Sequence, residues 1–179
     1  MGQYYFPIFL KSKALDVEEI KAWMLAHEYA DGLKLMEHSF IDNNFMNTVE
    51  HELSPNGSHY KSRFVWAGDY ADEEKGFDKN LYHLCDEATH ISPTEKAVSI
   101  YQYVVNHTKK QFVDKAKVPE RDGSRNHPLS ILTCEGNGRG NGDFRGEHEL
   151  IGYWARDVIS MEFKKPEMFI EIVFDLQED

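Results

Sequence analysis

The chain has 179 residues, and its 20 Lys and Arg against 31 Asp and Glu give a formal charge of −11. This acidic total argues against general binding to nucleic acid or to an anionic membrane, and no apolar run approaches the roughly 18 residues that cross a membrane. The two cysteines, Cys85 and Cys134, are too few for a disulfide framework. Since hydrophobic residues make up 41% of the chain, we expect one soluble, cytoplasmic globular domain over residues 1–179.

The first third of the chain alternates predicted strands and helices. Residues 3–10 are β-branched and aromatic and predict a strand, which Pro7 places at a sheet edge or at a bulge. Acidic residues followed by one apolar face predict a helix over residues 17–27. A second strand is predicted at 33–40, and apolar residues at helical spacing predict a short helix over 44–53.

Predicted strands dominate the remainder of the chain. β-branched and aromatic segments predict strands at 62–67 and 99–105, and the second turns back through a hairpin into 110–114. One helix over 94–117 is the alternative, and the β-branched residues in that segment disfavour it. Further strands are predicted at 130–133, 150–163 and 168–174. Strands in antiparallel order with two or three short helices predict an α+β fold.

Several polar and aromatic segments are distributed over most of the chain. They are residues 1–5 (MGQYY), 32–39 (GLKLMEHS), 66–72 (WAGDYAD), 105–110 (VNHTKK), 135–140 (EGNGRG) and 154–157 (WARD). Together these segments resemble a family of uncharacterised proteins encoded in bacterial and phage genomes. The resemblance implies a setting in host manipulation or counter-defence, and it implies no particular reaction.

The strongest chemical signal is a Gly/Arg-rich loop at about residues 135–149. Five of the six arginines and seven of the twelve glycines lie between residues 121 and 156. Alternating glycines let consecutive backbone N–H groups converge on an anion, and guanidinium groups form paired hydrogen bonds with phosphate oxygens. A surface loop whose arginines pair with neighbouring acids is the alternative. The expected binding residues are Gly136, Gly138, Arg139, Gly140, Arg145 and Arg156, with Trp154 stacking on a base.

Two other groups of residues are candidates for catalysis or metal binding. Asp69 and Asp72 follow a predicted strand, where carboxylate oxygens can hold Mg²⁺. His38 lies beside Glu37 in a polar segment and can transfer protons near neutral pH, as can His107. The ordinary alternatives are a solvated turn for the aspartates and a hydrogen-bonded, half-buried ring for each histidine.

These patterns favour a protein that binds a phosphorylated or nucleotide-like small molecule through the Gly/Arg-rich loop. One alternative is a metal-assisted phosphoester hydrolase in the same pocket. Its catalytic groups would be His38, Glu37 and Asp69, and Asp69 and Asp72 would hold Mg²⁺. The other alternative is an acidic protein that binds a host protein or mimics the charge of DNA. Homo-oligomerisation is compatible with all three hypotheses.

Overall fold

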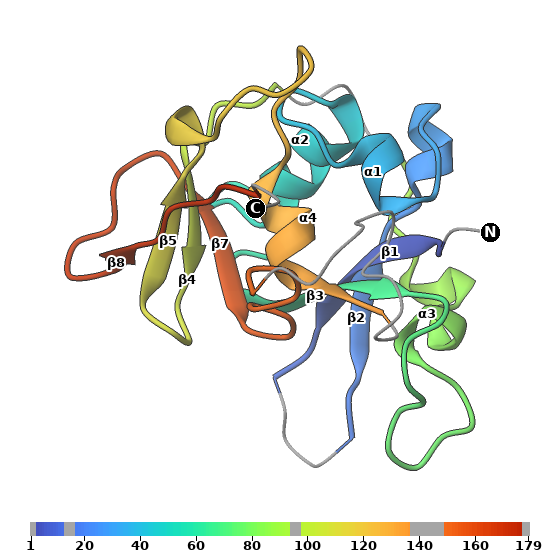
Figure 1. Ribbon diagram of the computed structural model, residues 1–179. Coiled ribbons are helices and arrows are strands. Elements are labelled where there is room, and N and C mark those ends of the chain that lie inside the picture. Colours follow the sequence, from blue (N-terminus) through green and yellow to red (C-terminus); the bar gives the residue numbers. More distant parts are fainter. Residues whose placement is uncertain (1–2, 13–16, 94–97, 137–148, 177–179) are drawn as a thin grey trace.

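The computed structural model describes residues 3–12, 17–93, 98–136 and 149–176 (Figure 1). One mixed, mostly antiparallel sheet has the strand order β2-β1-β3-β7-β4-β5-β8, with β6 paired to β3. The predicted α+β fold is therefore confirmed. The strands are β1 Tyr5–Leu10, β2 Ile20–Trp23, β3 Ser62–Gly68, β4 Tyr103–Asn106, β5 Gln111–Asp114, β6 Cys134–Glu135, β7 Val158–Glu162 and β8 Ile170–Glu171. The helices are α1 Leu35–His38, α2 Asn44–Glu52, α3 Leu81–Leu84 and α4 Pro128–Thr133, with 3-10 turns η1 Ala26–Tyr29, η2 Glu87–Thr89 and η3 Lys115–Lys117.

The two faces of the sheet are covered unequally. Along β3, Phe64 and Trp66 point into the larger apolar cluster, which α1, α2 and α4 cover on one side of the sheet (Figure 1). Successive side chains of a strand point to opposite faces, so Val65 belongs to a second, smaller cluster that includes Leu81 of α3. This second face is only partly covered. Beyond the smaller cluster it presents the polar and charged side chains described below.

The helix predicted over residues 17–27 is not present, because this segment forms β2 and then the turn η1. Strand β2 pairs with β1 in antiparallel register, with Trp23 opposite Ile8. The Trp23 indole N–H also donates to the backbone carbonyl of Asp86 at 2.7 Å. Pairing with a neighbouring strand here outweighs the local helical pattern, as tertiary context often does.

Two predicted strands are helical in the structure. Residues 33–40 contain α1, whose first turn is closed by the Lys34 backbone N–H donating to Glu37 Oε2 at 3.0 Å. Residues 130–133 lie in α4, where His127 Nδ1 accepts from the backbone N–H of Leu129 at 3.1 Å. Short apolar runs do not distinguish a strand from a buried helix by periodicity, and these capping contacts decide the outcome.

The other predicted elements are present, with shorter bounds in places. The strand at 3–10, the helix at 44–53, the strand at 62–67 and the hairpin strands correspond to β1, α2, β3, β4 and β5. The strands expected at 150–163 and 168–174 reduce to β7 and β8.

Pro7 lies in an interior strand rather than at the predicted edge, since β1 is paired on both sides. It stands opposite Trp66 of β3, and its carbonyl accepts from the backbone N–H of Met24 at 3.2 Å. Backbone N–H and C=O groups of one strand residue point to the same side, so the donor that proline lacks faces away from β3. The β1–β3 ladder therefore loses no hydrogen bond to Pro7.

Candidate functional site

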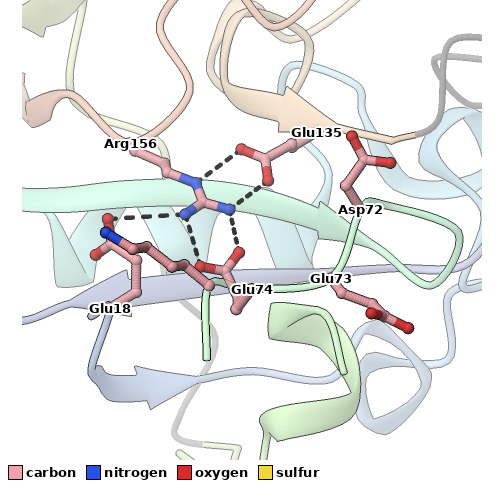
Figure 2. A pocket seen from close by; sticks show the side chains of 7 residues that line it. Glu18, Asp72, Glu73, Glu74, Glu135 and Arg156 are labelled. Carbon is pink, nitrogen blue, oxygen red and sulfur yellow. Dashed lines mark hydrogen bonds and ion pairs between the residues drawn. The ribbon is translucent and has the colours of Figure 1, made fainter. Parts of the chain in front are cut away.

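Arg156 lies at the centre of a group of carboxylates on the partly covered face of the sheet (Figure 2). Its Nε donates to Glu135 at 2.8 Å, and its Nη1 donates to Glu74 at 3.0 Å and lies 3.7 Å from Glu18. Burial by itself lowers the pKa of Arg156, but the hydrogen bonds with Glu135 and Glu74 outweigh burial and raise it. The guanidinium is thus bound by the protein's own carboxylates, and a ligand anion would have to displace them.

Glu18 connects Arg156 with a second arginine, Arg63 of β3. Arg63 donates from both terminal nitrogens to Glu18, at 2.6 and 2.8 Å, and from Nε to the backbone carbonyl of Arg156 at 3.1 Å. The Glu18 side chain is only 5% exposed. A paired contact of this kind at low exposure is stronger and better oriented than a surface ion pair. These three residues form a fixed wall with one pocket on each side.

The pocket on the Arg156 side is acidic. It has a volume of about 430 Å³, and in Figure 2 Asp72 and Glu73 point away from the guanidinium. Across the described ranges, no group of three or more His, Cys, Asp or Glu side chains has an arrangement that could hold a metal ion. The lining residues are Glu18, Asp72, Glu73, Glu74, Lys75, Glu135 and Arg156.

The pocket on the Arg63 side is basic, and it lies where β1 ends and where β2 and β3 begin. It has a volume of about 390 Å³, and the four charged residues that line it within the described ranges are all cationic. Because Leu10 of β1 pairs with both Ile20 of β2 and Arg63 of β3, the three strand ends lie side by side. The lining residues are Leu10, Lys11, Ser12, Lys21, Tyr60, Lys61, Ser62, Arg63 and Val158.

The cations of the basic pocket differ in how far they are neutralised. Arg63 is bound to Glu18, whereas Lys11 forms only an exposed pair with Glu19 at 2.9 Å, with side chains 56% and 64% exposed. Neither Lys21 nor Lys61 has an ion pair among the residues that the structure describes. The pocket therefore presents two uncompensated positive charges on a protein whose formal charge is −11.

The predicted catalytic histidine, His38, lies in the core. Its side chain is fully buried, its Nδ1 donates to the Gly32 carbonyl at 2.8 Å, and its Nε2 accepts from the Trp66 indole N–H at 3.1 Å. An indole N–H only donates, which assigns the neutral tautomer with its proton on Nδ1. Burial lowers the pKa of His38. The ring is thus hydrogen-bonded through both nitrogens, as in the alternative considered above, but it is fully rather than half buried.

The other predicted catalytic and metal-binding residues do not meet His38. Glu37 accepts the Lys34 backbone N–H that closes α1. Asp69 accepts the backbone N–H of Tyr4 at 3.0 Å, and Asp72 lines the acidic pocket. The structure therefore places these carboxylates in separate environments rather than around one Mg²⁺ ion.

The predicted anion-binding residues are also separated. Trp154 is fully buried and donates from its indole N–H to Gln111 at 3.0 Å, so its ring packs in the core and does not stack on a ligand. Gly136 follows β6, and a side chain there would overlap that of Gln3. Four residues of the predicted loop lie outside the described residues: Gly138, Arg139, Gly140 and Arg145.

No family model, curated protein or solved structure matches this chain. The resemblance to bacterial and phage proteins therefore stays a prediction. Within the described ranges, no helix has both the length and the apolar character needed to cross a membrane.

Sequence reasoning missed the basic pocket. Its lysines are isolated in the sequence, at positions 11, 21 and 61, and each resembles an ordinary solvated side chain. The one available signal is that Lys11 and Lys61 lie at the ends of correctly predicted strands. Which ends lie side by side depends on the pairing of β1 with β2 and β3.

Proposed function

We propose that the protein binds a phosphate-bearing small molecule in the basic pocket. This proposal keeps the class of ligand expected from the sequence and moves the binding site from the Gly/Arg-rich loop to the ends of β1, β2 and β3. One observation carries it: among the described residues, every charged side chain that lines the pocket is cationic, in a protein of strongly negative charge. A cytoplasmic location, expected from the composition, is part of the proposal.

The lining of the pocket suits a phosphate group. Lysine ammonium groups bind phosphate oxygens as compact point charges, and the hydroxyl group of Ser12 adds a neutral hydrogen-bond donor. Burial, reinforced by Glu162, raises the pKa of Tyr60 to about 12, so the phenol keeps its proton and donates it to Glu162 at 2.8 Å. Leu10 and Val158 supply apolar contact for the rest of the ligand.

Charge also explains why an anion would enter this pocket and how it would be retained. An exposed ion pair such as Lys11–Glu19 contributes at most about 1 kcal/mol, so a ligand can replace Glu19 at small cost. The buried pair of Arg63 with Glu18 stays intact and orients the wall. The five carboxylates of the neighbouring pocket repel an anion, and the negative field of the whole protein disfavours long polyanions relative to a small molecule.

Isothermal titration calorimetry with inorganic phosphate at constant ionic strength tests the proposal. The double variant Lys21→Gln/Lys61→Gln removes both uncompensated charges, and Lys79→Gln, at an exposed lysine outside the pocket, is the matched control. Charge-assisted hydrogen bonds contribute about 1.5–3 kcal/mol, so the double variant should bind phosphate at least about tenfold more weakly. Absence of phosphate binding by the unmodified chain, or equal binding by the double variant, would overturn the proposal.

A further inference from the structure

Lys61 stands between the basic pocket and the hairpin that joins β4 to β5. It directly precedes Ser62, the first residue of β3, which pairs with Ile159 of β7. On the other side of β7, Ile159 pairs with Asn106, the last residue of β4. Because neighbouring strands lie about 4.8 Å apart, the backbones at Ser62 and Asn106 are separated by roughly 10 Å. The hairpin therefore begins close to the pocket.

His107 is the first residue of the turn in this hairpin, and a chain of hydrogen bonds links it to Tyr60, which lines the basic pocket. Its Nε2 lies 2.7 Å from Oγ of the buried Ser160, which in turn donates to Glu162 at 2.7 Å. Tyr60, which lines the basic pocket, donates from its hydroxyl to the same Glu162 oxygen at 2.8 Å. Since the Ser160 proton goes to Glu162, Ser160 Oγ accepts from His107 Nε2. The imidazole is thus oriented by the same polar network that reaches the pocket.

Lys110 lies near His107, because both side chains contact the ring of Phe169. Its Nζ lies 5.1 Å from the centre of the Phe169 ring, and that ring packs edge-on against His107 with centroids 5.6 Å apart. Its neighbour Lys109 pairs with Asp157, whereas Lys110 has no ion pair within the part of the chain that the structure describes. Lys110 is therefore the cation of the hairpin that remains available to a ligand.

The pKa of His107 agrees with the presence of Lys61 and Lys110 near its ring. The pKa of His107 is lowered to about 4, first by burial and then by the charges of Lys61 and Lys110, against the opposing charge of Glu162. Both lysines thus act on one imidazole. Glu162 accepts hydrogen bonds from Tyr60 and Ser160, whereas neither lysine has an ion pair among the described residues. An anion placed near the two lysines would offset their charges.

We infer that Lys61 and Lys110 form a second anion subsite beside His107 and that the ligand carries two linked phosphate groups. The inference rests on the proposed function, because the first phosphate occupies the basic pocket. Lys61 contacts both groups, and Lys110 contacts only the second. Nucleoside diphosphates and nucleoside bisphosphates share this chemistry and differ in the spacing of their phosphates.

Calorimetric titration of the full chain with three probes tests the inference. The probes are inorganic phosphate, pyrophosphate and thymidine 3′,5′-bisphosphate, each at the same ionic strength. We expect at least one two-phosphate probe to bind about tenfold or more tightly than phosphate. Lys110→Gln should lose most of this gain while its affinity for phosphate stays within about twofold. Lys110→Arg, which keeps the charge, should restore the gain, and Lys79→Gln should behave like the unmodified chain.

The outcomes separate this inference from the proposed function. If phosphate binds but two-phosphate probes gain nothing, or if Lys110→Gln keeps the whole gain, the second subsite is wrong and the basic pocket stands. If the unmodified chain binds no phosphate, the proposed function fails as well. A larger gain with pyrophosphate supports directly joined phosphates, and a larger gain with the bisphosphate supports phosphates separated by a sugar.

Discussion

Glu50 and Lys115 form an ion pair inside the protein, although 65 residues separate them in the sequence. The Glu50 carboxylate is fully buried and also accepts from His127 Nε2 at 2.6 Å and from Ser99 Oγ at 3.0 Å. Burial alone raises the pKa of Glu50, but the hydrogen bonds and charges of His127 and Lys115 outweigh it and lower the pKa. This network joins α2 to η3 and to the start of α4.

Removing one partner from this network should strongly destabilise the fold. Lys115→Met leaves a buried carboxylate without its main counter-charge, and breaking such a pair costs about 3–5 kcal/mol of the free energy of unfolding. Urea denaturation measures the loss. Lys117→Met is the matched control, because Lys117 forms an exposed ion pair with Glu171 and its loss should lower the free energy of unfolding far less. Similar losses for both variants would contradict a stabilising buried pair.

Arg156 should prove structural rather than ligand-binding. Arg156→Gln leaves Glu18, Glu74 and Glu135 facing one another without their shared cation, so we expect the free energy of unfolding to fall by about 2–4 kcal/mol. The affinity for phosphate should change little, since the basic pocket lies on the other side of the Arg63–Glu18 wall. Denaturation and calorimetry on the same variant check both statements. Lost phosphate binding with unchanged stability would support the original anion-binding role of Arg156.

The protein should lose stability as the pH falls below neutrality. His38, His107 and His127 have pKa values lowered chiefly by burial, and Glu50 also has a lowered pKa, so the unfolded chain binds more protons than the folded one. Their contribution is complete above the unfolded histidine pKa of about 6.5 and is lost as the pH falls through the folded values, which for His107 is about 4. Each extra proton steepens the loss by up to about 1.4 kcal/mol per pH unit.

Urea midpoints at about pH 7.5, 6.5 and 5.5 would show this trend. A stability that stays constant or rises over that range would contradict the burial of neutral histidines.

Binding of a two-phosphate ligand should raise the pKa of His107. The second phosphate offsets the charges of Lys61 and Lys110, which favours the imidazolium and moves the pKa upward from about 4. By linkage, the ligand should bind more tightly at a pH between the free and the bound pKa values than above both. NMR titration of the His107 ring with and without pyrophosphate measures the shift. In the Lys110→Gln variant, which binds pyrophosphate without the second contact, the shift should be smaller; an equal shift would argue against the subsite.

Parts of the fold could be predicted because their signals are local. Helix α2 has a capping residue directly before it, with Asn43 accepting the backbone N–H of Met46 at 3.0 Å, and apolar residues at helical spacing. The β4–β5 hairpin has two β-branched strands around a polar turn. By contrast, β2 and α4 depend on a neighbouring strand and on the His127 cap, which outweigh their local patterns.

The candidate site could not be predicted because it is assembled by long-range pairing. The arginine cluster between residues 121 and 156 is visible in the sequence, but the acids that neutralise Arg156 include Glu18 and Glu74, which are far away along the chain. The same pairing of strands that buries Glu18 beside Arg63 gathers the isolated lysines into one pocket. A residue's charge can be read from the sequence, whereas its neutralisation depends on the fold.

The most direct test of phosphate binding in the basic pocket is an NMR titration of the backbone amides with inorganic phosphate at constant ionic strength. The account predicts saturable shifts at Lys11, Lys21, Lys61 and Ser62, which surround the pocket. An unchanged spectrum, or shifts confined to the residues around Arg156, would contradict it.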